Sequence, residues 1–144
     1  MIEKDTVRLL RECDAGIKMG VDSIEDVLPD IESDELEEKL TNSKNEHIEL
    51  QKDLQELLDN YHDDGKDPNP IAKTMSWMKT SFKMATDKSD KTAADLMTDG
   101  CNMGIKSLAK YLNEYKAADE KSKDIAKKVI NLEEKLVRDL REYL

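Results

Sequence analysis

The chain of 144 residues contains only two histidines, His47 and His62. For each of them the sequence offers acidic residues that could be its partners. His47 lies on the apolar stripe of a predicted helix, while Asp14 and Glu133 lie on or near the inward faces of two others. If these three side chains meet, they need a positive partner such as Lys18 or Lys44, because unpaired buried charges are costly. The pattern favours a polar centre that stabilises the fold over acid–base chemistry, which also requires a cleft and substrate groups. His47 alone fits a core-edge histidine, a pH-sensitive group or a former metal ligand.

The second histidine belongs to the one carboxylate-x-x-His pattern in the sequence, formed by Asp59 and His62. This spacing places both side chains on one face of a helix, as a site for a divalent cation requires. The pattern lies at a predicted helix end beside Asp63, Asp64 and Gly65, where acidic residues are common because the loop is in water. We therefore expect adventitious cation binding there at most, and no specific metal site.

Two cysteines and two glycines could also take part in chemistry, but packing explains them better. Cys13 and Cys101 are too few for a disulfide scaffold or a four-thiolate zinc site, and buried cysteine behaves as a small apolar residue. Gly16 and Gly104 lie inside predicted helices rather than in a phosphate-binding loop, so we expect them to allow close helix packing. Because the sequence also lacks a nucleophile–base pattern, we predict no catalytic residue and no cofactor.

The side chains discussed so far are carried on predicted helices. Apolar residues spaced by three and four cover about residues 6–28, 34–61, 90–115 and 119–144, with a shorter stripe at 70–86. Five Gly, three Pro, one Trp, four Tyr and one Phe leave little material for an all-β fold. The predicted fold class is all-α.

An internal repeat predicts how these helices are grouped. The pattern Cys-x-x-Gly-Ile-Lys occurs at residues 13–18 and again at 101–106. Residues 47–58 align with residues 133–144 in the same order, keeping Leu, Asp, Leu, Glu and Leu in register. The simplest architecture is therefore two helical hairpins joined by a crossover.

The predicted hairpins span residues 5–62 and 90–144, with the crossover and its short helix at 63–89, in a single domain of residues 1–144. This order of helices, with a Cys-x-x-Gly element early in each hairpin, resembles the bacterial ferritin-like proteins grouped as a domain family of unknown function. The resemblance implies a ferritin-like four-helix bundle.

Ferritin-like proteins that use metal place a Glu on each of two helices and Glu-x-x-His on each of the other two. Of the six corresponding positions here, His47 and Glu133 alone retain a metal-binding side chain. The other four positions carry Ile17, Ile105, Lys44 and Ile130. The resemblance thus implies a non-catalytic bundle. The alternative is a di-metal oxidase or iron-handling protein with iron or manganese at a degenerate site around His47.

Charge and hydropathy restrict the partners. The 33 acidic and 23 basic residues give a net charge of −10, which opposes binding to nucleic acids and anionic membranes. No apolar run is long enough to span a bilayer, and the first residues lack the apolar core of a secretory signal. We expect a cytoplasmic protein.

The predicted crossover is the one stretch with enough large apolar side chains to centre an interface, among them Trp77, Met78 and Phe82. These side chains either cover the core or contact another chain, since thioethers and aromatic rings are typical of interface centres. We predict a homodimer or a protein partner at this position. The leading function is accordingly a binding or structural role.

Overall fold

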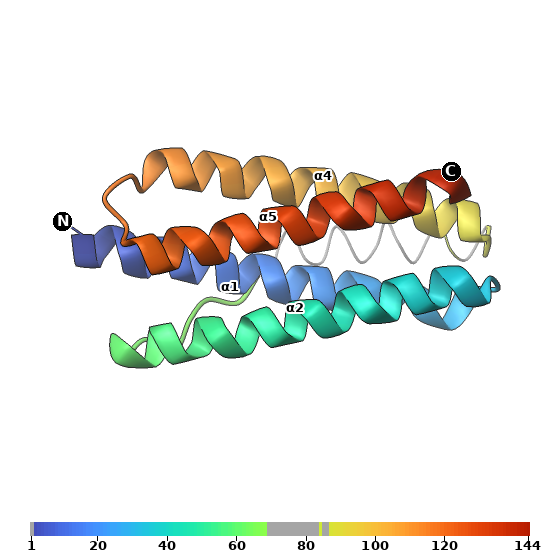
Figure 1. Cartoon of the computed structure of the whole chain (residues 1–144). Helices are drawn as coiled ribbons and strands as arrows, with labels where there is room; N and C mark the ends of the chain where they lie inside the picture. The colour runs from blue at the N-terminus through green and yellow to red at the C-terminus, as the bar shows by residue number, and fades with distance from the viewer. Residues whose placement is uncertain (1, 69–83, 85–86) are drawn as a thin grey trace.

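The computed structural model describes residues 2–68, 84 and 87–144, and Figure 1 shows four long helices. They are α1 (Ile2–Val27), α2 (Asp34–Asn60), α4 (Asp90–Glu114) and α5 (Glu120–Leu140). Single-turn 3-10 helices follow α1 and α5, namely η1 (Leu28–Asp30) and η2 (Arg141–Tyr143). The part of the chain that the structure describes contains no strand, so the predicted all-α fold class is confirmed.

Part of the predicted crossover lies outside the described residues. This holds for Trp77, Met78 and Phe82, and for the predicted helix at 70–86 apart from Met84. Met84 is 4% exposed and packs in the core. The chain is therefore in contact with the core six residues before α4 begins.

Local sequence signals set the helix ends. Pro29 lies in the 3-10 turn that follows α1, because proline cannot continue the hydrogen-bond ladder of an α-helix. The next three long helices each begin at a side-chain cap that accepts a backbone N–H three residues ahead. These caps are Ser33, Ser89 and Asp119. The predicted starts of the second and last long helices are thus confirmed.

The four helices form a bundle of two antiparallel hairpins. Figure 1 shows α1 and α5 running in one direction and α2 and α4 in the other. α1 packs on α2 and α4 on α5, while the hairpins meet through α2 with α5 and α1 with α4. α1 also touches α5 across the bundle. Because α2 ends opposite the end where α4 begins, the connection between them has to span the bundle length (Figure 1).

The core consists of two apolar clusters, one in each half of the bundle. One cluster joins the C-terminal part of α1 to the starts of α2 and α4, and includes Ile24, Leu40 and Cys101. The other joins the N-terminal part of α1 to the end of α2, and includes Cys13, Ile17 and Leu58. Between the two clusters lie the buried side chains of His47 and Glu133.

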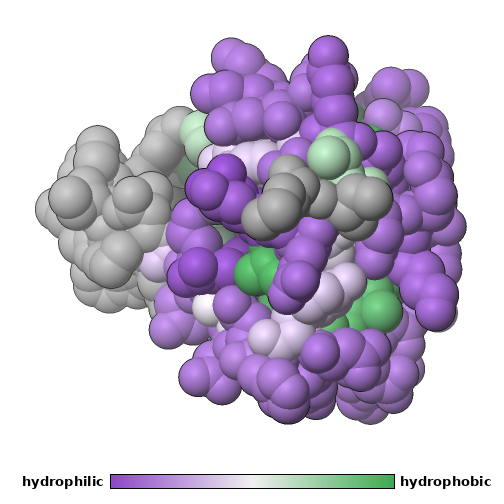
Figure 2. All heavy atoms as spheres, turned by 90° about the vertical axis from the view of Figure 1, so that its left-hand side faces the viewer, coloured by the Kyte–Doolittle hydropathy of each residue, from purple (hydrophilic) through white to green (hydrophobic). Residues whose placement is uncertain are grey.

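The outer surface is polar. Figure 2, which views the molecule from the left-hand end of Figure 1, shows hydrophilic side chains over most of the described surface. Met103 and Leu144 are the large apolar side chains that are exposed among the described residues. Within the same residues, no helix is both long enough and apolar enough to cross a lipid bilayer.

Candidate functional site

The buried pair of His47 and Glu133 joins α2 to α5 at mid-bundle. His47 Nε2 lies 2.9 Å from Glu133 Oε1, and His47 Nδ1 lies 2.7 Å from the carbonyl oxygen of Ser43. A carbonyl oxygen only accepts, so Nδ1 carries a proton and donates it to Ser43. The other bond then joins either an imidazolium to a carboxylate, or a neutral imidazole to a protonated Glu133. Both nitrogens of His47 are therefore engaged in either state.

The environment of His47 favours its charged form. Burial by itself lowers the pKa of His47, since the charged ring loses hydration. The hydrogen bond to Glu133 and the negative charge of that residue act the other way, as do the Ser43 carbonyl and the charge of Glu46. Their combined effect exceeds that of burial, so the pKa of His47 is raised above its ordinary 6.5.

Side chains from the other two helices complete the surroundings of this pair. A Cβ atom at Gly20 of α1 would lie 2.9 Å from His47 Nε2 and 3.4 Å from Glu133 Oε1, so glycine there makes room for the pair. From α4, Cys101 lies close enough to Glu133 for that residue to raise the pKa of its thiol. We call Gly20, His47, Cys101 and Glu133 the polar centre, and all four helices contribute to it.

The thiols of the chain are held in their neutral form. Burial raises the pKa of Cys101, and the charge of Glu133 and the hydrogen bond to it raise the pKa further. Burial also raises the pKa of Cys13 to about 12, with smaller contributions from the charges of Glu12 and Asp14. A nucleophilic cysteine requires the thiolate, so neither residue has the features of one. The two residues also belong to separate core clusters.

Asp14 is buried but belongs to a different site. Its Oδ2 atom lies 2.9 Å from Lys18 Nζ and accepts the backbone N–H of Lys66 at 3.0 Å. Gly65, with φ +85°, allows this approach, because a Cβ atom there would lie 2.3 Å from Asp14 Oδ2. Asp14 therefore holds the loop after α2 against α1. Its positively charged partner is Lys18, one of the two lysines suggested from the sequence.

The cluster considered from the sequence is thus divided in two. His47 and Glu133 meet, whereas Asp14 lies six residues before Gly20, a rise of about 9 Å along α1. Lys44, the other proposed partner, is half-buried. Gly20 was not among the predicted site residues, because nothing in the local sequence distinguishes it from Gly16.

Within the described part of the chain, the two glycines expected to allow close packing have no close neighbour. A Cβ atom at Gly16 would have no atom of the described residues within 4 Å, and one at Gly104 would meet only Glu133 Cδ, at 4.0 Å. The closest approaches occur at Gly20 and Gly65 instead. Among the residues that the structure describes, no neighbouring backbone approaches Gly16 or Gly104.

The prediction that Asp59 and His62 share one helical face is wrong. α2 ends at Asn60, and His62 adopts a left-handed φ of +54°, which takes it out of the helical register. Asp59 instead accepts a hydrogen bond from Gln55 Nε2 at 2.9 Å. Across the described residues, no group of three or more His, Cys, Asp or Glu side chains is arranged to hold a metal ion.

A cavity of about 300 Å³ lies between α1 and α4 and reaches the polar centre. It extends along α1 from Glu12 to Val27, and Cys101 and Glu133 form part of its wall. We call it the α1–α4 cavity. Its size is at the lower end of the range of small-molecule sites.

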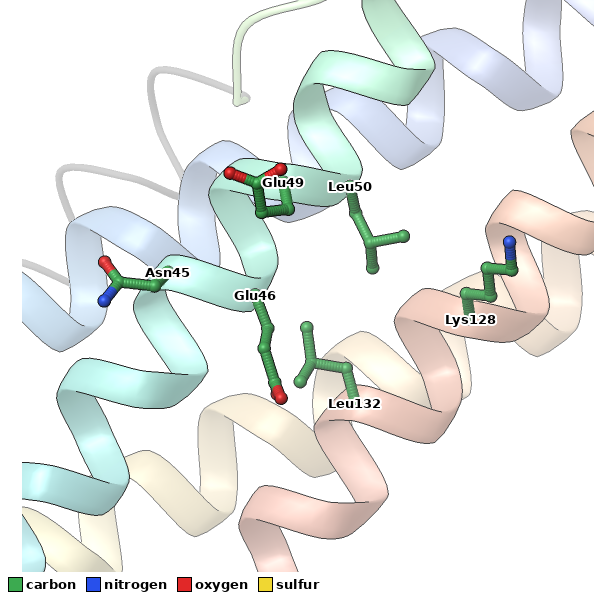
Figure 3. A pocket seen from close by; sticks show the side chains of 6 residues that line it. All are labelled: Asn45, Glu46, Glu49, Leu50, Lys128 and Leu132. Carbon is green, nitrogen blue, oxygen red and sulfur yellow. The ribbon is translucent and has the colours of Figure 1, made fainter.

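A second hollow of about 400 Å³ lies on the outer side of α2 and α5. Figure 3 shows Leu50 of α2 and Leu132 of α5 pointing into the gap between the two helices. Glu46 and Lys128 border it, and Glu46 also lies 3.5 Å from Lys135. This hollow offers two apolar side chains within a charged rim, and it does not reach the polar centre.

Comparison of the chain with protein-family models, with curated proteins and with solved structures gave no match in any of the three.

Proposed function

We propose that the chain is a non-catalytic ferritin-like bundle with a binding or structural role in the cytoplasm. Two antiparallel hairpins, with a connection that has to span the bundle between α2 and α4, support the ferritin-like part of this proposal (Figure 1). The net charge of −10 supports a partner other than nucleic acid or an anionic membrane.

The single observation that carries the non-catalytic proposal is the closed pairing of His47. Its Nδ1 atom donates to Ser43 and its Nε2 atom is bonded to Glu133, so a metal ion would have to displace a hydrogen bond. Replacement ligands are lacking at the positions where the resemblance places them, since Ile17 and Ile130 have no donor atoms. This supports a polar centre that stabilises the bundle.

Metal analysis tests this proposal. We expect protein purified without chelator to contain metal far below one ion per chain, and iron titration to give no saturable site. Two iron or manganese ions per chain, lost in His47→Ala and kept in His62→Ala, would contradict the proposal and support the di-metal alternative. His62 is the matched control because it is the second histidine and lies on the surface.

We further propose that Trp77, Met78 and Phe82 form the contact with a second copy or another protein, because large apolar side chains are unusual on so charged a chain. Light scattering tests the homodimer. We expect Trp77→Ala to lower the apparent mass, and Met103→Ala, an exposed apolar residue of α4, to leave it unchanged. A monomer at high micromolar concentration, or an oligomer that Trp77→Ala leaves intact, would contradict a homodimer at this position.

A further inference from the structure

The outer face formed by α2 and α5 carries opposite charges on its two helices. α2 contains nine acidic and three basic residues, which makes it the most acidic of the four long helices. α5 contains six basic and five acidic residues, and among these four helices it alone has more basic than acidic side chains. We call the outward surface of this helix pair the α2–α5 face. It has an acidic half and a basic half on a chain whose net charge is −10.

Each half of the α2–α5 face places two charged residues around a leucine with the same spacing. Residues at steps of four and then three lie on one side of a helix. On α2 these are Glu46, Leu50 and Asp53, the acidic row, and on α5 they are Lys128, Leu132 and Lys135, the basic row. Figure 3 shows both leucines pointing into the gap between the helices. The two rows therefore border the same hollow with opposite charges.

The charges of the two rows are only partly paired within one copy of the chain. Glu46 lies 3.5 Å from Lys135, and both side chains are exposed. At the other end of the rows, Asp53 and Lys128 are exposed and form no ion pair within the part of the chain that the structure describes. An acidic and a basic side chain are thus free to bind a partner whose charges have the opposite arrangement.

A second copy of the chain has this opposite arrangement. In a two-fold dimer the same surface of both copies forms the interface. If the axis runs parallel to the helices, α2 of each copy lies on α5 of the other at the same height along the bundle. Because Glu46 is level with Lys135 within one copy, each acidic row then faces a basic row in register. An axis perpendicular to the helices would place α2 on α2, where like charges repel.

The size of the α2–α5 face suits a dimer. The 21 residues of α5 give the face a length of about 30 Å at the helical rise of 1.5 Å per residue. Two helices packed about 10 Å apart are together about 20 Å wide. The face then covers about 600 Å² on each copy, so a dimer buries about 1,200 Å², the lower end of the range for stable interfaces. An interface of this size that depends on charge pairs should be sensitive to salt.

We propose that two copies of the chain associate through the α2–α5 face, about a two-fold axis parallel to the helices. The acidic row of each copy faces the basic row of the other, and the leucines of both rows form the apolar centre. The proposal goes beyond the proposed function, because it uses none of the crossover residues Trp77, Met78 and Phe82.

Sedimentation equilibrium of the full chain tests the association. The measurement is made on Trp77→Ala, so that a contact through Trp77 does not contribute to the mass. We expect a dimer at high micromolar concentration, with a Kd that rises at least about tenfold between about 50 mM and 500 mM NaCl. A monomer at the lower salt concentration would overturn the proposal. The crossover contact is tested separately, by comparing the unchanged chain with Trp77→Ala.

Reversing the charges of one row at a time tests the location and the axis. The acidic-row variant carries Glu46→Lys with Asp53→Lys, and the basic-row variant carries Lys128→Glu with Lys135→Glu. Each variant alone places like charges opposite each other, and we expect its Kd to rise at least about 100-fold. An equal mixture of the two variants should form the dimer again, because every contact between unlike copies joins opposite charges.

The matched control reverses two lysines on another helix. Lys106 and Lys110 are exposed on α4, and Lys106→Glu with Lys110→Glu changes the net charge as much as the basic-row variant does. We expect this control to leave the dimer unchanged. Circular dichroism checks the fold of each variant, and Asp53→Asn provides a milder change that should weaken the dimer without repulsion.

Two results would overturn the proposed arrangement even if a dimer exists. A dimer that persists in both row variants, with unchanged circular dichroism, would place the interface on another surface. Row variants that are monomeric alone and remain monomeric in the mixture would exclude the pairing of α2 with α5. Neither result bears on metal content, which tests the non-catalytic function.

Discussion

Replacing Gly20 by alanine should destabilise the protein, although alanine is the better helix former. In an exposed helix interior, Gly→Ala stabilises by about 1 kcal/mol. At Gly20 the new methyl group would lie 2.9 Å from His47 Nε2, 3.0 Å from His47 Cδ2 and 3.4 Å from Glu133 Oε1. The imidazole cannot simply move away, because its Nδ1 atom is held 2.7 Å from the Ser43 carbonyl. Relieving the clash therefore requires the hydrogen bonds of the polar centre to be distorted or broken.

The size of the effect follows from two costs and one gain. Overpacking a core costs about 1–3 kcal/mol. Disrupting the bond between His47 and Glu133 costs about 1.5–3 kcal/mol, the range for hydrogen bonds to charged groups. Setting the helix-propensity gain of about 1 kcal/mol against these costs leaves a net destabilisation of about 1.5–5 kcal/mol. The sign is therefore opposite to that expected from helix propensity.

Urea denaturation followed by circular dichroism measures the effect, with Gly16→Ala as the matched control. Gly16 lies one turn earlier in α1 and a Cβ atom there meets nothing within 4 Å among the described residues, so we expect stabilisation of up to about 1 kcal/mol. In a His47→Ala background the clash is removed, and Gly20→Ala should become neutral or stabilising. The reasoning is refuted if Gly20→Ala is as stable as Gly16→Ala in the otherwise unchanged protein.

Two further predictions concern the buried ionisable groups. Because the pKa of His47 is raised in the folded chain, the contribution of its pair with Glu133 should be complete below the unfolded pKa of about 6.5 and decline as pH rises through the folded pKa. The difference in urea midpoint between the unchanged protein and His47→Gln should shrink as the pH rises above about 6.5, and a constant difference would contradict this. Asp14→Ala should cost about 1–3 kcal/mol and speed amide exchange at Lys66, whose N–H it binds. Unchanged exchange at Lys66 would show that Asp14 does not hold the loop.

The sequence determined the helices and their buried faces. Helix ends at Pro29, Ser33 and Asp119 depend on proline geometry and on caps that bond three residues ahead, which are properties of local segments. The burial of His47 and Glu133 follows from their positions on apolar stripes, since a helix buries the face that repeats every three to four residues. These features are readable without knowing how the helices are packed.

Tertiary structure alone decided which buried groups meet. Gly16 and Gly20 lie one turn apart on the same face of α1, yet only Gly20 lies against the imidazole of His47. The rotation and axial position of α2 decide this, and both are set by packing across the whole bundle. Asp14 bonds to the N–H of Lys66, 52 residues away, rather than to the polar centre, since the left-handed turn at Gly65 brings that loop onto α1. Periodicity fixes the face on which a side chain lies, whereas its partner depends on the relative position of separate helices.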